Sequence, residues 1–416
     1  MARYTDAAFF RFFAFCLLGI AAACAPLKPV SEQNMAHLYS RNAPVSVDFS
    51  LAGSPEEVLV FCRLSFQFPE FSAEKPGFWD QYSLEYQLRP GFESSRALQR
   101  DSVRPDMLIR GSGLQPVFQI SFPRAAADRV LFLKIRPRFS ADEYGFTCRI
   151  PGDESGELSP FALFSSRGKI PVSGAYAKAG DTLFLRSFDY RKNAIRVDFS
   201  PFSPAIAMPP MATMSLLDTA AQPFYPVSIR LNEARIFRQP GYYLVRDSSG
   251  SGGFGFAIGE GEFPRLSTAQ ELISPLVYIS TREERKAVQN AENPKLALDQ
   301  FWLKISPQKD RARELIKRYF LNIEEANRHF TIAKEGWKTD RGMVMAIFGP
   351  PYQVFRTQDA EVWIYDKGHG PENSVFYFFR KRADNFADIW ELKRLGDYDK
   401  VWYGVVDLWR KGLIDR

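Results

Sequence analysis

The segment Gly336-Trp337-Lys338-Thr339-Asp340-Arg341-Gly342 runs into an apolar stretch at residues 343–348, which Gly349-Pro350-Pro351 ends. Glycine adopts positive φ more readily than any other residue, and proline has no N–H to donate to a β-ladder. A polar segment between two glycines, followed by apolar residues and a Gly-Pro-Pro stop, therefore predicts a turn, a buried strand and a second, tight turn.

Two roles are open for the polar turn. In the structural role, the side chains of Thr339 and Asp340 accept backbone N–H groups and cap the turn. Trp337 then anchors the loop to a sheet, and Arg341 pairs with Asp340 or with a buried carboxylate. In the functional role, the same turn presents Trp337 and Arg341 to a partner. We favour the structural role, in which the turn fixes the register of the strand.

The surrounding sequence predicts an α+β domain at residues 269–416. Ser306-Pro307 is typical of a helix start, with Ser at the N-cap and Pro in the first turn, and apolar residues keep a helical spacing from Leu315 to Phe330. Three β segments follow the Gly-Pro-Pro stop, at residues 361–365, 374–380 and 389–394, and residues 398–413 have the pattern of an amphipathic helix. Helices packed on one face of an antiparallel meander sheet fit this order.

The Gly-Trp-x-Thr-Asp pattern resembles the signature of the GWxTD-domain family, which occurs in cell-envelope proteins of Gram-negative bacteria and has no settled activity. The likeness extends over the C-terminal third of the chain and includes Asp299-Gln300-Phe301-Trp302, Glu325-Ala326-Asn327, Trp363-x-Tyr365, Trp402-Tyr403 and Trp409-Arg410. A fainter likeness connects Gly349-Pro350-Pro351 and Trp363-x-Tyr365 to the small lipoprotein subunit of the outer-membrane protein assembly machine. The resemblance implies an envelope protein and leaves its activity open.

The region before residue 269 predicts β-structure. From Val45 onward apolar and polar residues alternate, and short alternating segments recur between Gly, Pro, Asp and Ser clusters. This spacing predicts an antiparallel β-sandwich at residues 44–151. Residues 152–268 predict a second, less regular β region with a long loop from residue 201 to 214, and one larger β unit covering both regions stays open. The fold class is thus multidomain, with N-terminal sandwich-like regions and a C-terminal α+β domain.

The first residues have the parts of a secretory signal. Arg3 and Arg11 give a positive start, and residues 12–23 are an unbroken run of small and apolar residues, too short to span a bilayer. The ending Ala21-Ala22-Ala23-Cys24 resembles a lipobox, in which cleavage leaves a lipid-modified Cys24. We therefore expect a signal peptide at residues 1–23, a polar tether at residues 24–43 and an outer-membrane lipoprotein. The alternative is cleavage at an Ala-x-Ala site with Cys24 an ordinary residue.

Two cysteines remain in the body of the chain. Cys62 and Cys148 both lie on the apolar side of predicted strands. An exported protein with one remaining pair can oxidise it to a disulfide. Two separate buried thiols are the equal alternative.

The rest of the sequence narrows the function classes. The chain has 54 basic and 48 acidic residues, mixed along its length, which does not predict nucleic-acid binding. The segment from Gly250 to Gly255 fits G-x-G-x-x-G but is followed by strand-like residues rather than a helix, so we expect no dinucleotide or other cofactor. With three histidines in all, neither a metal site nor a catalytic set emerges.

We therefore expect a non-enzymatic interaction or scaffold subunit of an envelope assembly, in outer-membrane protein assembly or protein secretion. Tryptophan and arginine are the residue types that anchor interfaces, and the exposed members of Trp337, Arg341, Trp402 and Trp409 are the candidates. The alternative is an envelope hydrolase that uses His329 or His369 with carboxylates not identified from the sequence.

Lipidation at Cys24 gives the first testable prediction. Replacing Cys24 with Ala should release the protein from the membrane fraction and remove the mass of the lipid, because a thiol at the new N-terminus is the attachment point. Cell fractionation and intact-mass measurement check it. An unchanged distribution together with an unchanged mass would rule the anchor out.

Overall fold

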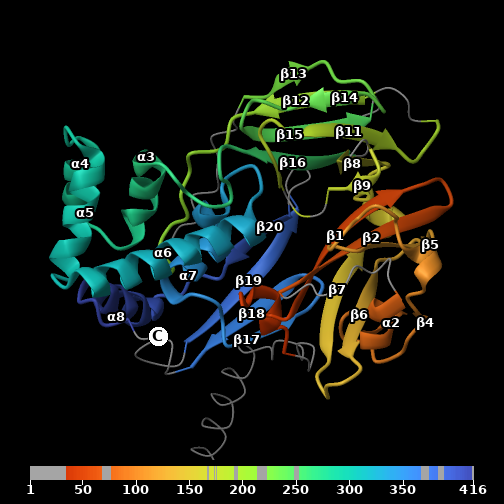
Figure 1. Cartoon of the computed structure of the whole chain (residues 1–416), viewed down its shortest axis with the longest axis horizontal. Coiled ribbons are helices and arrows are strands. Elements are labelled where there is room, and N and C mark those ends of the chain that lie inside the picture. The colour runs from red at the N-terminus through yellow and green to blue at the C-terminus, as the bar shows by residue number, and fades with distance from the viewer. Residues whose placement is uncertain are drawn as a thin grey trace, which may run out of the picture.

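A computed structural model describes residues 34–67, 76–165, 168–172, 174, 176–191, 195–212, 223–247, 253–366, 374–382 and 388–414. Figure 1 shows three units: a first β-sandwich in red to yellow, a second β-sandwich in green, and a C-terminal unit of helices and one sheet in teal to blue. The predicted fold class is confirmed. In the described part of the chain no helix is both long and apolar enough to cross a membrane.

The first sandwich closes around its own apolar core. One sheet has the order β1-β2-β5 and the other β4-β3-β6-β7, both antiparallel. Alternate residues of both sheets, including Val60, Phe118, Leu133 and Phe146, face each other in the core. The strands are β1 (Val45–Gly53), β2 (Glu57–Phe66), β3 (Tyr82–Arg89), β4 (Gln99–Ser102), β5 (Val117–Pro123), β6 (Arg129–Pro137) and β7 (Tyr144–Ile150), with the helical turns α2 (Pro76–Gln81) and η2 (Pro105–Met107) between them.

The second sandwich has a separate core. Its sheets have the orders β10-β16-β15-β12-β13 and β14-β11-β8-β9, and Phe161, Leu185, Val245 and Ile258 lie between them. The strands are β8 (Phe161–Ser165), β9 (Ile170–Pro171), β10 (Tyr176–Lys178), β11 (Thr182–Ser187), β12 (Ile195–Ser200), β13 (Tyr225–Val227), β14 (Ala234–Ile236), β15 (Gly241–Asp247) and β16 (Gly253–Gly259). The short helix η3 (Asp153–Ser155) precedes it.

A small apolar cluster joins the two sandwiches. Phe61 of β2 packs edge-to-face on Phe164 of β8, with ring centroids 5.9 Å apart, and Val117 and Ile170 belong to the same cluster. The two β regions therefore have separate cores, joined by this apolar cluster.

The C-terminal unit packs helices on an antiparallel meander sheet of order β17-β18-β19-β20. Its core holds Trp363, Tyr365 and Phe376 of the sheet against Tyr319 and Trp409 of the helices. The elements are α3 (Ala269–Ile273), η4 (Ser274–Tyr278), α4 (Arg282–Gln289), α5 (Pro294–Ile305), α6 (Lys309–Phe330), η5 (Gly336–Lys338), α7 (Asp340–Phe348), β17 (Gln353–Arg356), β18 (Ala360–Tyr365), β19 (Ser374–Arg382), β20 (Asp388–Leu392) and α8 (Tyr398–Arg410).

Local capping explains where these helices begin. Thr268 and Thr281 each form a capping box with the Glu three residues later, at α3 and α4. At α5, Asn293 caps and Pro294 follows. The predicted helix start at Ser306-Pro307 is two residues early, because Ser306 ends α5 and α6 begins at Lys309.

The predicted tether is wrong from Asn34 onward, because residues 34–43 pack into the protein; we call them the N-terminal strap. Met35 is fully buried and Tyr39 is 4% exposed, and both belong to the core of the C-terminal unit. The Met35 N–H donates to the Val354 carbonyl of β17 at 2.8 Å. The strap contains the short helix η1 (Ala36–Tyr39), and its composition alone gives no sign of this packing.

The strap also contacts the first sandwich. The His37 ring nitrogen Nε2 lies 2.6 Å from the Gly145 carbonyl of β7, and its ring packs edge-to-face on Phe146. Apolar residues of the sandwich, Val130 and Phe132, join the core of the C-terminal unit. The strap therefore lies between the two units and touches both.

Ion pairs add to the same junction. Arg380 of β19, whose side chain is 8% exposed, donates to Glu157 at 2.6 Å and to Asp388 at 2.9 Å. Arg149 of β7 pairs with both Glu157 and Asp128. Arg380 therefore links β19 through Glu157 to Arg149 of the first sandwich.

The loop after β12 crosses from the second sandwich to the C-terminal unit. Its Ser203 N–H donates to the Ala333 carbonyl at 3.0 Å, and its Ala207 N–H donates to the Lys338 carbonyl at 2.9 Å. The Met208 carbonyl accepts from Arg394. The long loop predicted at residues 201–214 is thus bound along the C-terminal unit over its described residues, 201–212.

Candidate functional site

The signature folds as a helix start. η5 covers Gly336–Lys338 and α7 covers Asp340–Phe348, so the predicted turn is followed by a helix and the predicted buried strand is wrong. Thr339 is the N-cap: its Oγ1 accepts the Gly342 N–H at 3.0 Å and donates to the Gly336 carbonyl at 2.7 Å. Because residues 341–348 are all buried, the run has no polar face whose spacing could indicate helix or strand.

Both signature glycines allow backbones to touch. A Cβ on Gly336 would lie 1.9 Å from the Ala326 carbonyl oxygen of α6, and a Cβ on Gly342 would lie 1.8 Å from the Gly336 carbonyl oxygen. No side chain fits at either distance. α6, η5 and α7 therefore pack at a separation that only glycine permits.

The Gly-Pro-Pro stop ends α7. Gly349 has φ of 75° and ψ of −163°, a backbone region that is essentially restricted to glycine, and its carbonyl accepts from the Tyr365 hydroxyl at 2.8 Å. Pro350 and Pro351 then lead to β17, since proline cannot continue the helix. The tight turn predicted here is present, although it follows a helix.

Trp337 is the buried anchor of the signature. It is 1% exposed, its backbone N–H donates to Asn327 Oδ1 at 3.2 Å, and its carbonyl accepts from the Tyr278 hydroxyl at 2.8 Å. Asn327 of α6, itself fully buried, also donates to the Pro264 carbonyl. Trp337 therefore holds α6 and η4 together and presents no surface to a partner.

Asp340 holds the end of the sheet. Its carboxylate accepts two hydrogen bonds from Arg394, at 2.7 and 3.1 Å, and a third from the Leu392 N–H at 2.7 Å. Both partners lie at or just beyond β20. The carboxylate also sits in the first turn of α7, where the helix dipole favours negative charge. Asp340 thus pairs with Arg394, and the predicted Asp340–Arg341 pair is not formed.

Arg341 belongs to a buried charge cluster, which we define as Arg341, Arg356, Glu361 and Tyr39. Glu361 of β18 is fully buried, and Arg341 is 9% exposed. The Glu361 carboxylate accepts from Arg356 at 2.5 Å, from the Tyr39 hydroxyl at 2.9 Å and from Arg341 at 3.3 Å. The Trp363 indole N–H donates to it at 3.1 Å. Of the two partners predicted for Arg341, Asp340 or a buried carboxylate, the structure has the buried carboxylate of Glu361.

Electrostatics hold this cluster in its charged form. Burial opposes ionisation of Glu361, but the charges of Arg356 and Arg341 outweigh burial and lower the pKa of Glu361. The pKa of Tyr39 is raised, first by burial and then by Glu361, so Tyr39 stays a neutral donor. The Arg341 guanidinium also lies over the rings of Phe330 and Trp390, 4.6 and 4.8 Å from their centroids.

The C-terminal tryptophans are core residues as well. Trp402 is 4% exposed and Trp409 is fully buried, and the Trp409 indole N–H donates to the Ile347 carbonyl at the end of α7. With Trp337 and Arg341, all four residues proposed as interface anchors are buried. The expectation that exposed members of this set form an interface is therefore wrong.

In the described residues, the two cysteines and His329 have the following surroundings. Cys62 and Cys148 are buried free thiols in the core of the first sandwich, and burial raises the pKa of Cys148 to about 12. His329 lies 3.3 Å from Glu325 and packs on the Tyr39 ring. In the residues that the structure covers, no three potential metal ligands come together. Cys24 and His369 lie outside the described residues.

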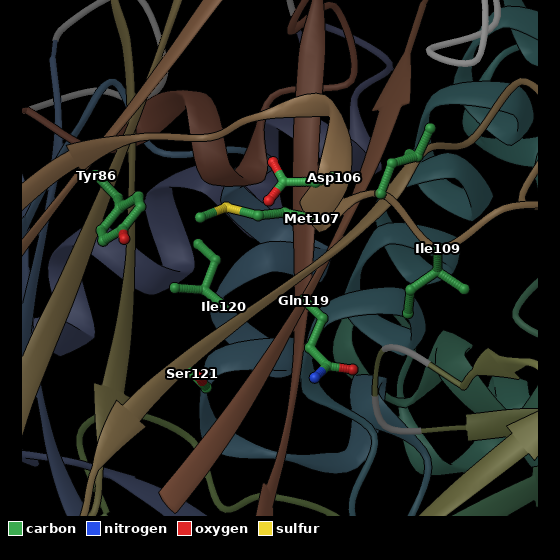
Figure 2. A pocket seen from close by; sticks show the side chains of 8 residues that line it. Tyr86, Asp106, Met107, Ile109, Gln119, Ile120 and Ser121 are labelled. Carbon is green, nitrogen blue, oxygen red and sulfur yellow. The ribbon is translucent and has the colours of Figure 1, made fainter.

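One hollow opens on the first sandwich, with a volume of about 360 Å³. Figure 2 shows its lining side chains, which come from β3, β5 and the segment around η2. Asp106 is the acidic member and pairs with Arg104 at 3.3 Å on the surface. The lining residues are Tyr86, Asp106, Met107, Leu108, Ile109, Gln119, Ile120 and Ser121. One solvated carboxylate beside apolar groups and amides can bind a ligand, but it does not form a catalytic set.

The geometry defines a structural α+β domain whose signature residues hold helices, sheet and strap together. Residues 241–411 match the family model of the GWxTD domain, so this part of the chain is a GWxTD domain. The match begins at β15, in the second sandwich, which is earlier than the boundary predicted at residue 269. No curated protein matches the chain.

Sequence reasoning missed the partners of the signature. Glu361 lies on the same face of β18 as Trp363 and Tyr365, because residues two apart on a strand point the same way. A charged residue on such an apolar face indicates a buried partner of opposite charge. Tyr39 carries no comparable signal, because it lies in a segment without periodicity. Asn327 falls in the segment that resembles the family, but the sequence does not indicate its bonds to the signature.

The close approach of α7 to η5 predicts the effect of Gly342→Ala. The added Cβ meets a backbone oxygen, so the helix must shift, and the free energy of unfolding should fall by about 3 kcal/mol or more. The matched control is Gly396→Ala, where nothing lies within 4 Å and stability should stay within about 1 kcal/mol. Denaturant unfolding of both variants checks this, and equal stabilities would contradict the packing.

The buried charge cluster predicts a distinct effect for Glu361→Gln. It leaves two guanidinium groups without their carboxylate, and the free energy of unfolding at neutral pH should fall by about 3–5 kcal/mol. Because the folded pKa of Glu361 lies below its unfolded value of about 4.3, its contribution is complete above that value and is lost as the pH falls through the folded pKa.

Unfolding measured from neutral to acidic pH tests both statements. The gap between the wild type and Glu361→Gln should narrow in acid. The control Glu314→Gln, with half of its side chain exposed, should leave stability nearly unchanged. A constant gap across this pH range would show that the charge of Glu361 is not the source of the stability.

Proposed function

We propose that the protein is a non-enzymatic interaction or scaffold subunit of the cell envelope, held to the outer membrane by lipid on Cys24 and acting in outer-membrane protein assembly or protein secretion. The observation that carries the proposal is the use of the signature. Its side chains and backbone make internal contacts: Trp337 with η4, Asp340 with β20 and Arg341 with the strap. The residues that define this domain type stabilise its own fold. Such a domain can hold binding surfaces elsewhere on the protein in a fixed position.

The arrangement of the three units supports a scaffold. The first sandwich is joined to the GWxTD domain by the strap, by shared core residues and by the Arg380–Glu157 pair. The second sandwich contributes β15 and β16 to the matched residues, and its loop at residues 201–212 is bound to the C-terminal unit. Several independent attachments of this kind hold binding surfaces at fixed distances from one another.

The strap connects the proposed anchor to the domain. Ten residue steps separate Cys24 from Asn34, so even a fully extended chain reaches about 35 Å. Asn34 is bound to β17, where its side chain accepts the Val354 N–H at 3.0 Å. In a lipid-anchored protein, β17 of the GWxTD domain would therefore lie close to the membrane, and the partners proposed here would be met near its surface.

The exposed aromatic residues of the GWxTD domain are the better interface candidates. Tyr403 of α8 is 61% exposed and Tyr352, just before β17, is 54% exposed. Tyrosine supplies a large contact area with a polar end and is frequent at the centres of interfaces. They replace the four buried residues considered from the sequence.

Crosslinking in membranes, followed by affinity purification of the tagged full-length protein, tests the proposal. We expect a stoichiometric envelope complex whose recovery falls severalfold in the double variant Tyr352→Ala/Tyr403→Ala. The control is Tyr190→Ala in the second sandwich, where the side chain is 77% exposed and recovery should be unchanged. A protein that remains solitary, or a loss that is equal in the control, would refute the interaction role of these two tyrosines.

A further inference from the structure

A second hollow lies where the strap and α6 meet Ile414, beyond α8. Its volume is about 300 Å³. Three separate segments line it: Arg41 of the strap, one side of α6, and Ile414. The lining residues are Arg41, Arg311, Glu314, Leu315, Lys317, Arg318, Leu321 and Ile414. We call this hollow the basic pocket.

The rim of the basic pocket carries positive charge. Four of its eight lining residues are basic and one is acidic. Lys317 is exposed and Arg318 is half-buried, both one turn beyond Glu314 on α6, so the basic groups lie on the solvent side. Glu314 pairs with Arg311, and Glu325 pairs with Arg41. Set against the four basic residues, these two carboxylates still leave a net positive charge in the lining, which attracts an anion.

The floor of the basic pocket is apolar. Leu315 is 1% exposed and Ile414 is 7% exposed. Leu321, one to two turns further along α6, is the third apolar residue of the lining. An acyl chain or glycerol carbon can be buried against such a floor, whereas a free inorganic ion gains nothing from it. The pocket therefore has a basic rim for an anionic group and an apolar floor for hydrocarbon, as the binding site of an amphiphile requires.

Internal bonds keep the walls of the pocket in place. Arg311 donates to the Gly412 carbonyl at 2.8 and 3.0 Å and to the Ile414 carbonyl at 2.8 Å, which fixes residues 412–414 against α6. Arg41 donates to Asn322 at 3.4 Å and pairs with Glu325 at 3.3 Å. Arg311 and Arg41 thus form the walls, and Lys317 and Arg318 are the groups at the opening.

We propose that the basic pocket binds the phosphate-bearing headgroup of an anionic membrane lipid, with the first carbons of the lipid on the apolar floor. Charge complementarity and the apolar floor select this ligand, and the pocket is too small for a folded partner. Arg41 belongs to the strap, which follows the proposed lipid attachment at Cys24 in the sequence. The inference deepens the proposed function by naming a membrane partner, and it does not require lipidation.

Vesicle co-sedimentation tests the site on the unlipidated chain of residues 25–416, which holds every described element. We expect binding to phosphatidylcholine vesicles that contain phosphatidylglycerol and none to phosphatidylcholine alone. The double variant Lys317→Glu/Arg318→Glu should weaken binding about tenfold or more, because each basic group near an anionic surface contributes to the attraction.

A matched control separates the pocket from general charge. Arg282→Glu/Lys286→Glu on α4 makes the same change in net charge at exposed positions and should weaken binding less than about threefold, the screened effect of distant charges. An equal loss in both double variants, or no loss in the pocket variant, overturns the proposal. If unfolding shows that the pocket variant is misfolded, Lys317→Glu alone replaces it.

Competition identifies the ligand class. Soluble short-chain phosphatidylglycerol should displace the protein from the vesicles, and inorganic phosphate at the same concentration should not. Displacement by both alike would point to a free-anion site and overturn the lipid assignment. Because lipidation is measured on Cys24→Ala in cells and this site on an unlipidated chain, failure of either is distinguishable from failure of the other.

Discussion

The carboxylate of Glu361 is the group on which the arrangement of the GWxTD domain depends. It is fully buried and collects donors from four places: β17 through Arg356, α7 through Arg341, the strap through Tyr39, and its own strand through Trp363. A buried charge without partners costs several kcal/mol, so arrangements of these elements that leave Glu361 unpaired are disfavoured by about that amount. Apolar packing would tolerate small shifts of α7 against the sheet, whereas the charge cluster specifies one position.

Structural roles and recognition coincide in the signature. Gly336 and Gly342 set the distance between helices, Thr339 starts α7, Asp340 holds β20 and Arg341 reaches Glu361. Each residue type is required by geometry alone, without reference to a ligand. A sequence motif of this kind indicates a shape, and the binding chemistry of the protein must be sought on surfaces such as the basic pocket, which the motif does not include.

Sequence reasoning predicted correctly those elements in which apolar and polar residues alternate regularly. The alternation of residues 45–51 predicted β1, in which Val45, Val47, Phe49 and Leu51 pack on the core of the first sandwich. Residues 343–348 were predicted as a strand and form α7, because a run buried on all sides has no period. Partners far apart in the chain were the other limit: a buried carboxylate for Arg341 could be anticipated, but Tyr39, 302 positions away, could not. The strap was predicted as a tether because two buried side chains in ten residues do not make a pattern.

The strap has a consequence for the order in which the chain can fold. Met35 bonds to Val354 and Tyr39 to Glu361, a separation of 322 positions in the latter case. Contacts of such separation form late, because the loop between them must first be closed at a cost in entropy. Each sandwich can fold once its own strands have been synthesised. The strap is synthesised early, but its partners in β17 and β18 are synthesised more than 300 residues later. In an exported chain, the earliest residues to cross a membrane would remain unpaired until nearly the whole protein had followed.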